Sequence, residues 1–189
     1  MKGIKKFAVV AMAAIMTIAG TCTAFAADSP ATSVKPVAKT EVSVSLVSTA
    51  KKAKVTTTAK GEAKLETLGK TTAPVVTLTS KVTIDGVTYK LTSVSEGAFA
   101  KCSKDTWKVT LPKSIEKIEA NAFTGSKLKQ FNVYSTKSIK VSKKAFEGVN
   151  TKKMTVKVTK NMSKTELKKF KKALKAAGFK GKVVQMKHH

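Results

Sequence analysis

Hydrophobic and polar residues alternate in short segments along much of this chain, and one six-residue phrase recurs among them. It has an apolar residue, three variable positions, alanine and phenylalanine, as in Val94–Phe99, Ile118–Phe123 and Val141–Phe146. The three phenylalanines lie 24 and then 23 residues apart. A fixed period in the low twenties is typical of a solenoid, because one unit cannot bury its own apolar face. We expect the phenylalanines to fill the core and the alanines to allow tight helical turns.

A triplet that favours a β-strand follows each phrase: Val109–Leu111, Phe131–Val133 and Val156–Val158. Alternation directs the first and third residues of each triplet into the core and the middle residue outward. Val75–Leu78 is expected to begin the same sheet. One outward residue from each strand gives a candidate binding face: Thr77, Thr110, Asn132 and Lys157.

Residues 41–92 are expected to form a β-rich N-terminal cap before the repeats at 93–158. Val42, Val44 and Leu46 alternate with serines and predict a strand, and Lys54–Thr58 predicts a weaker one. The stretch Gly61–Thr72 is expected to be mainly loop.

A β-hairpin is predicted around Asp85-Gly86, since both residues of this turn must adopt positive φ. In that register the apolar residues share one face, which suits them to closing the open end of a stack. These residues are Val82, Ile84, Val87, Tyr89 and Leu91.

Residues 159–189 are expected to form a helix-and-strand C-terminal cap. Ser163 and Glu166 have the spacing of a capping box, and Gly178 suits the end of the helix. Lys182–Met186 predicts a last strand. One arc of the helix is apolar: Leu167, Phe170, Ala173, Leu174 and Ala177.

The N-terminus has the features of a secretory signal peptide at residues 1–26. Three lysines precede the apolar run Phe7–Ala19, and Ala24-Phe25-Ala26 matches a cleavage pattern, so we expect cleavage near Ala26. Residues 27–40 are expected to be a flexible leader. The sequence therefore predicts a secreted or cell-surface protein.

All 37 basic residues are lysines, against 11 acidic residues, which gives a net charge of +26. Readers of nucleic-acid sequence rely on arginine forks, so no specific nucleic-acid partner is expected, although codon usage also explains the missing arginine. The lysines on the predicted helix are either a solvated face or a site for an anionic wall polymer or acidic lipid. The candidate helix lysines are Lys164, Lys168, Lys171, Lys172 and Lys175.

No catalytic or metal-binding set is recognisable. Histidine occurs only at His188 and His189, which are either native or a tag remnant, and the acids are scattered singly. We therefore expect no enzyme activity, no metal and no cofactor. Cys102 is the one cysteine beyond the signal peptide, and it is interpreted as a small core residue, with a reactive thiol as the alternative.

The three phrases, together with Val109–Pro112 and Ile84–Tyr89, resemble the BspA-like leucine-rich repeats of bacterial surface proteins, over Val75–Met186. The resemblance implies a leucine-rich repeat solenoid. This is a short parallel β-sheet with helical or irregular turns, a β-hairpin N-terminal cap and an α-helix plus strand C-terminal cap. It implies a binding and adhesion module, secreted or on the cell surface, for protein or cell-envelope ligands. Together with the missing catalytic set, we expect a non-enzymatic protein, and we expect it to be a monomer. The alternative is a cationic polyanion-binding protein, for cell wall or acidic lipid, with the repeats as scaffold.

Overall fold

The computed structural model describes residues 35–44, 53–71, 73–102 and 105–187. The expected signal peptide with its cleavage site near Ala26, the leader up to residue 34, Leu46, and His188 with His189 lie outside these residues. No helix among the described residues is both long and apolar enough to cross a membrane.

The described part of the chain consists of β-strands, one short 3₁₀ helix and one α-helix. The elements are β1 (Lys39–Val44), β2 (Ala53–Thr57), β3 (Glu62–Thr67), β4 (Val75–Thr77), β5 (Lys81–Ile84), β6 (Val87–Val94), β7 (Lys108–Leu111), β8 (Lys117–Ile118), β9 (Gln130–Val133), β10 (Lys140–Val141), η1 (Thr151–Lys153), β11 (Thr155–Val158), α1 (Lys164–Ala176) and β12 (Lys182–Gln185).

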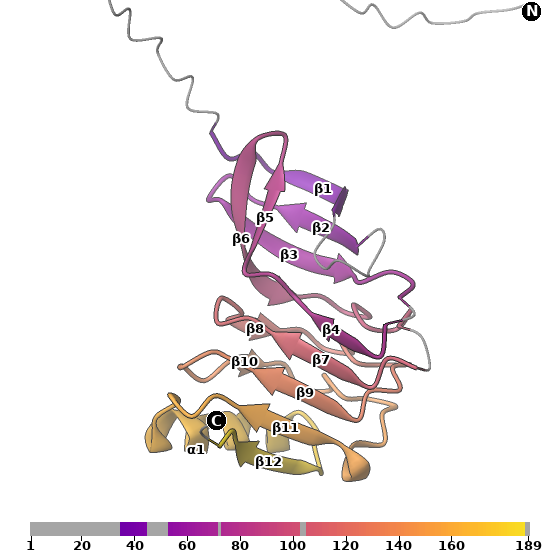
Figure 1. Ribbon diagram of the computed structural model, residues 1–189, viewed down its shortest axis with the longest axis vertical. Helices are drawn as coiled ribbons and strands as arrows, with labels where there is room; N and C mark the ends of the chain where they lie inside the picture. The colour runs from indigo at the N-terminus through magenta and orange to yellow at the C-terminus, as the bar shows by residue number, and fades with distance from the viewer. Residues whose placement is uncertain (1–34, 45–52, 72, 103–104, 188–189) are drawn as a thin grey trace, which may run out of the picture. The chain divides into compact units, whose positions relative to one another are not determined.

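Five parallel strands form what we call the repeat sheet, in the order β12–β11–β9–β7–β4 (Figure 1). Its strands are in register, so equivalent core residues from successive repeats lie side by side. These partners are Val76, Val109, Phe131, Val156 and Val183. The predicted strands and their inward residues are confirmed, since both core positions of each predicted triplet are fully buried.

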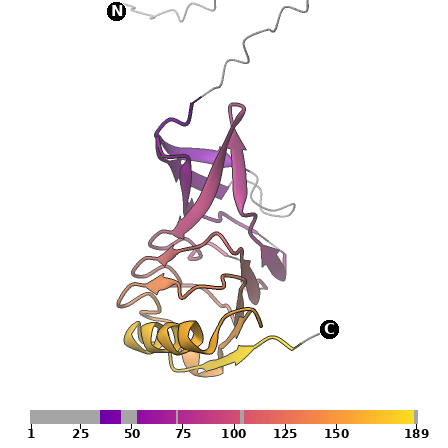
Figure 2. The same cartoon turned by 90° about the vertical axis from the view of Figure 1, so that its left-hand side faces the viewer.

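The other wall of the repeats contains strands that the sequence did not predict. β6, β8 and β10 pair in parallel, and each ends on the first residue of a phrase: Val94, Ile118 or Val141. Between these strands the Glu119 N–H donates to the Val94 carbonyl oxygen at 2.9 Å. The phrases then continue as hydrogen-bonded turns on this wall (Figure 2). The expectation of a single sheet is therefore wrong, because two-residue strands are too short to give a readable alternation.

Stacked phenylalanine rings occupy the core between the two walls. Phe123 lies at the centre, with its ring centroid 5.1 Å from that of Phe99 and 4.8 Å from that of Phe146. Phe131 of β9 approaches it from the repeat sheet at 5.3 Å. The repeated Ala-Phe dipeptide is thus a packing motif, as predicted from its period.

A three-stranded unit, β1–β2–β3, precedes the repeats and joins them where β3 pairs in parallel with β6. The expected loop at Gly61–Thr72 is wrong, because Ala63 and Leu65 of β3 are buried between their strand partners. β1 begins at Lys39, inside the expected leader. Just before it, the Tyr89 hydroxyl bonds both the N–H and the carbonyl oxygen of Val37, at 3.1 and 3.3 Å.

The predicted hairpin is present between β5 and β6. Ile84 pairs with Val87, and the turn residues Asp85 and Gly86 have φ of 48° and 78°. The five apolar residues assigned to its inner face are all buried. The outward Thr83 lies opposite Thr88, also as predicted.

The chain ends with α1 and β12, close to their expected positions. Ser163 caps the helix, its Oγ accepting from the Glu166 N–H at 3.2 Å. The second half of the predicted capping box is wrong. The Glu166 carboxylate instead accepts from the Ser138 N–H at 2.7 Å and from Lys169 Nζ at 2.8 Å. The Glu166 carboxylate therefore accepts from a backbone N–H of the loop before β10, and not from a free N–H at the start of its own helix.

Candidate functional site

The outer face of the repeat sheet presents rows of side chains, because side chains alternate along strands that are in register. One row contains all four residues of the predicted binding face and continues onto β12: Thr77, Thr110, Asn132, Lys157 and Val184. A second row runs parallel to it through Val75, Lys108, Gln130, Thr155 and Lys182.

The four predicted residues differ in how they meet solvent. Thr77 is exposed on β4, whereas Thr110 is only 7% exposed and offers little surface to a ligand. Asn132 and Lys157 are half-buried partners on adjacent strands. Only these last two line the hollow described next.

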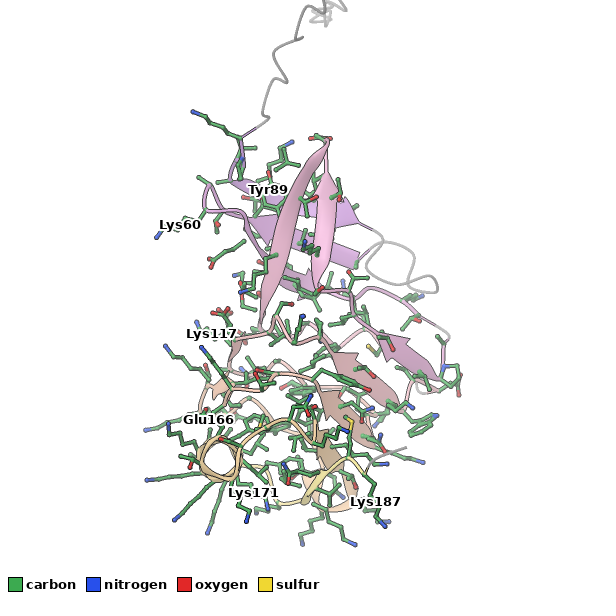
Figure 3. The ribbon with its side chains drawn as sticks, turned by 60° about the vertical axis from the view of Figure 1, so that its left-hand side comes forward. Lys60, Tyr89, Lys117, Glu166, Lys171 and Lys187 are labelled. Carbon is green, nitrogen blue, oxygen red and sulfur yellow. The ribbon has the colours of Figure 1, made fainter. Side chains whose placement is uncertain are left out.

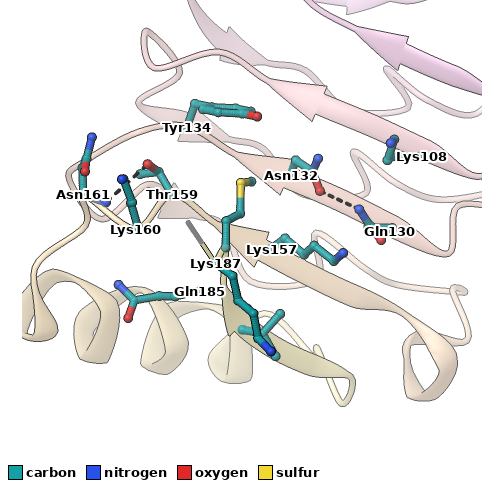
Figure 4. Close-up of a pocket in the computed structure, with 12 residues that line it drawn as sticks. Lys108, Gln130, Asn132, Tyr134, Lys157, Thr159, Lys160, Asn161, Gln185 and Lys187 are labelled. Carbon is teal, nitrogen blue, oxygen red and sulfur yellow. Dashed lines mark hydrogen bonds between the residues drawn. The ribbon is translucent and has the colours of Figure 1, made fainter. Parts of the chain in front are cut away.

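A groove of about 830 Å³ lies over the C-terminal half of this face (Figure 4). We call it the sheet-face groove. It extends past the strand ends, into the loop after β11 and the segment after β12. Among its lining residues are Gln130, Asn132, Tyr134, Lys157, Val184 and Lys187.

The groove exposes one aromatic ring and one apolar side chain, Tyr134 at 47% and Val184 at 41%. Neither was predicted as a site residue. Tyr134 directly follows β9, and its N–H donates to the Leu111 carbonyl oxygen at 3.2 Å, which continues the strand ladder. The one sequence feature that could have indicated Tyr134 is its position, as an aromatic residue directly after a repeat triplet. The hydrophobic pattern did not show that its side chain stays exposed.

Side-chain amides form the middle of the groove. Gln130 Nε2 donates to Asn132 Oδ1 at 2.7 Å, and the two residues share the outer face because they are two apart on β9 (Figure 4). Lys157 lies beside Asn132 on the next strand. Every charged residue among the described lining of the groove is a lysine.

Trp107 lies just before β7, at the opposite ends of the strands from Tyr134. Its side chain is 39% exposed, and Lys108 Nζ lies 5.2 Å from the centroid of its ring. A lysine side chain thus covers one face of this indole, and Trp107 does not line the groove.

The candidate helix lysines form a separate surface. All five are exposed on the side of α1 that faces away from the core, as Figure 3 shows for Lys171. None of the five lines the sheet-face groove. The one acid of α1 is Glu166, and the hydrogen bonds from Lys169 and from the Ser138 N–H hold the pKa of its carboxyl below its usual value. The structure therefore keeps the two predicted surfaces apart.

Residues 78–186 match the family model of the BspA type leucine-rich repeat region, in six copies. The chain belongs to this family. The matched range includes β12, which is in register with the repeats although no Ala-Phe dipeptide accompanies it.

Among solved structures, the chain is similar to a leucine-rich cell surface protein from Faecalibacterium prausnitzii A2-165, with 19% sequence identity and a TM-score of 0.45. The aligned part is 66% of this chain and 33% of that one, so this chain spans about a third of that protein. A comparison with curated proteins found no match.

The described residues contain no group of three His, Cys, Asp or Glu side chains that could hold a metal ion. Burial raises the pKa of the Cys102 thiol to about 11, which disfavours its reactive thiolate form. Cys102 is half-buried and packs against the core. Its burial is therefore intermediate between that of the predicted core residue and that of an exposed thiol.

Proposed function

We propose that this chain is a non-enzymatic, monomeric binding and adhesion module, secreted or held at the bacterial surface, that contacts protein or cell-envelope ligands through the sheet-face groove. The observation that supports this best is the placement of Asn132 and Lys157, together with the exposed Tyr134, in one groove on the outer face of the repeat sheet.

The terminal unit makes this face larger than the repeats alone could. Strands of three or four residues give a narrow surface, whereas a stable interface needs about 800 Å² on each partner. β12 adds Val184 to the row, and Lys160 and Lys187 extend the groove beyond the strand ends. The C-terminal unit then has a role in binding as well as in covering the end of the stack.

The test is a pulldown of the protein, without its expected signal peptide, on whole bacterial cells and on purified cell wall. The variant carrying Asn132→Ala and Lys157→Ala should lose binding, because both side chains point into the groove. Thr110→Ala is a matched control on the same row that removes a mostly covered side chain. Undiminished binding by the double variant would contradict the assignment of the groove.

A second candidate function is the binding of an anionic wall polymer or acidic lipid by the helix lysines, with the repeats as scaffold. It is favoured by five exposed lysines on α1, whose one acid is already bonded to Lys169 and Ser138. At 0.5 M salt, screening acts within about 4 Å, so purely electrostatic binding should disappear. Binding that survives this salt and still needs Asn132 supports the groove instead.

A further inference from the structure

We infer that the sheet-face groove binds an anionic carbohydrate chain, an inference that rests on the proposed function of the groove as the binding surface. The ligand class follows from three features on one face: charge of a single sign, one open aromatic ring and a pair of side-chain amides.

Charge is the first feature. Lysines from three strands or their extensions line the groove, at Lys108, Lys157 and Lys187, and no described lining residue is acidic. Lys157 and Lys187 form no ion pair among the described residues. Three acids of the repeats, Glu116, Glu119 and Glu147, pair with lysines outside the groove, the first of them with Lys90 at 2.7 Å. The groove therefore keeps its positive charge for a ligand that carries carboxylate, sulfate or phosphate groups.

The ring of Tyr134 is the second feature. Almost half of this side chain is exposed, and no side-chain hydrogen bond or ring contact is found for it among the described residues. An exposed ring at the end of the groove offers its flat apolar face, while its hydroxyl stays available to solvent or ligand. The apolar C–H face of a sugar ring fits such a surface, whereas a linear polyanion has no ring to place there.

The amide pair is the third feature. The hydrogen bond between Gln130 and Asn132 uses one donor and one acceptor, and it leaves Gln130 Oε1 and Asn132 Nδ2 for other partners. A neighbouring donor and acceptor held by a shared bond suit the paired hydroxyls of a sugar. Because both side chains stand on β9, the sheet fixes their spacing before a ligand arrives, which lowers the entropic cost of binding.

A protein ligand is less well matched. Protein interfaces concentrate their binding energy in aromatic or apolar anchors in desolvated pockets. Here the apolar residues of the described lining, Val184 and Met186 beside Tyr134, stand on an open face among lysines and amides, and Tyr134 and Val184 are exposed instead of enclosed in a pocket. Single-stranded nucleic acid needs successive stacking platforms, whereas the other exposed aromatic of this sheet, Trp107, lies outside the groove beneath Lys108.

Four probes separate ring recognition from charge, in isothermal titration calorimetry at 0.15 M salt. Oligogalacturonate carries sugar rings and carboxylates, its methyl ester carries the rings without the charge, polyphosphate carries charge without sugar rings, and oligo-dT is the nucleic-acid arm. We expect oligogalacturonate to bind at least about tenfold more tightly than each of the other three. Equal binding of polyphosphate, or tighter binding of oligo-dT, would overturn the inference.

Variants then assign the binding to the groove. Tyr134→Ala should weaken oligogalacturonate binding about five- to tenfold, Tyr134→Phe should retain it, and Lys157→Ala should weaken it and reduce its salt dependence. Lys143→Ala is the matched control, since it removes an exposed lysine from a repeat turn outside the groove, and it should bind as the wild type does. Lys171→Ala tests the helix surface instead. An effect of Lys171→Ala equal to that of Lys157→Ala would place the binding on the helix and refute the inference.

The two proposals fail in different ways. If wall or cell binding depends on Asn132 and Lys157 but oligogalacturonate does not bind, the ligand class is wrong and the groove assignment stands. If neither measurement depends on these residues, both proposals are wrong.

Discussion

The backbone N–H of Asn121 donates a hydrogen bond to the carbonyl oxygen of Lys144 at 3.0 Å, and both residues have positive φ, 55° and 64°. They occupy the same place in consecutive phrases, directly before Ala-Phe. Gly97 fills this place in the first phrase with φ of 63°, and its N–H donates to the Asn121 carbonyl oxygen at 3.1 Å. A left-handed residue is therefore built into each repeat, and it turns the chain so that the next phenylalanine enters the core.

Lys144→Gly should stabilise the protein. A residue with a Cβ loses about 1–2 kcal/mol in the left-handed region, while glycine costs about 0.5–1 kcal/mol in chain entropy. The exposed Lys144–Glu147 pair, at 3.7 Å, adds little. We expect a rise in Tm of about 1–3 °C, measured by circular dichroism. The neighbouring Lys143→Gly is the control, and it should lower Tm. If both variants lower it equally, left-handed strain at Lys144 is not significant.

Phe123→Ala should be among the most damaging single substitutions, at about 3–5 kcal/mol. Its ring is fully buried between those of Phe99 and Phe146 and is also in contact with Phe131, so truncation leaves a cavity that both walls border. Urea unfolding measures the loss. Tyr134→Ala removes an exposed aromatic and should cost less than about 0.5 kcal/mol. A small effect of Phe123→Ala would mean that the stack does not hold the repeats together.

Gly181→Ala should displace β12. A Cβ at Gly181 would collide with the carbonyl oxygens of Met154 and Thr151, which are backbone atoms that cannot move aside easily. We expect a loss of about 2 kcal/mol or more, together with weaker binding at the groove, since β12 contributes Val184. Gly97→Ala provides the comparison, because a Cβ there meets nothing within 4 Å and has only the backbone cost of about 1 kcal/mol. Equal losses would contradict the steric explanation.

Cys102 should react slowly with thiol reagents. Burial raises its pKa from 9.0 to about 11, so the thiolate population at pH 8 falls about 100-fold relative to the unfolded chain. The folded state binds the thiol proton more tightly than the unfolded chain does. The contribution of the protonated Cys102 to stability is therefore complete below pH 9 and is lost as the pH rises toward 11. Ellman's reagent tests this on a Cys22→Ser variant, folded and in urea. Rates within tenfold of each other would show that Cys102 is accessible as thiolate.

Alternation and period were enough to predict the repeat sheet and the hairpin. Val109 and Leu111 point inward because a two-residue period leaves no other choice, and Asp85-Gly86 sets the register of its hairpin locally. β3 was missed because its two buried residues, Ala63 and Leu65, stand among charged residues with low strand propensity and gain their partners only when β2 and the distant β6 pair with the strand.

The candidate site was predicted only where it follows from the strand register. Asn132 and Lys157 were found because outward residues of parallel strands must adjoin. Tyr134 and Val184 were not found, since their exposure depends on where the chain turns after β9 and on how β12 docks against β11. Thr110 was predicted as a site residue because it faces outward, but its neighbours cover it and leave it only 7% exposed.

Glu166 should make the docking of α1 sensitive to acid. Its carboxylate accepts from Lys169 and from the Ser138 N–H, and these bonds lower its pKa below 4.5, because they favour the charged form. The folded pKa lies below the unfolded value, so this stabilisation is present above pH 4.5 and is lost as the pH falls through the folded pKa. Tm measured from pH 7 to pH 3 should therefore fall less steeply for Glu166→Gln than for the wild type.

The matched control for this profile is Glu147→Gln, which removes an exposed carboxylate from a repeat turn and leaves α1 untouched. The Tm of Glu147→Gln should follow the wild-type curve. The Tm of Glu166→Gln should lie below that of the wild type at neutral pH and should approach it in acid. If the Glu166→Gln and Glu147→Gln curves coincide over the whole range, the bond from Ser138 does not hold the helix. The bond between α1 and the loop before β10 would then be a consequence of packing by Phe170 and Leu174, the fully buried residues of the helix.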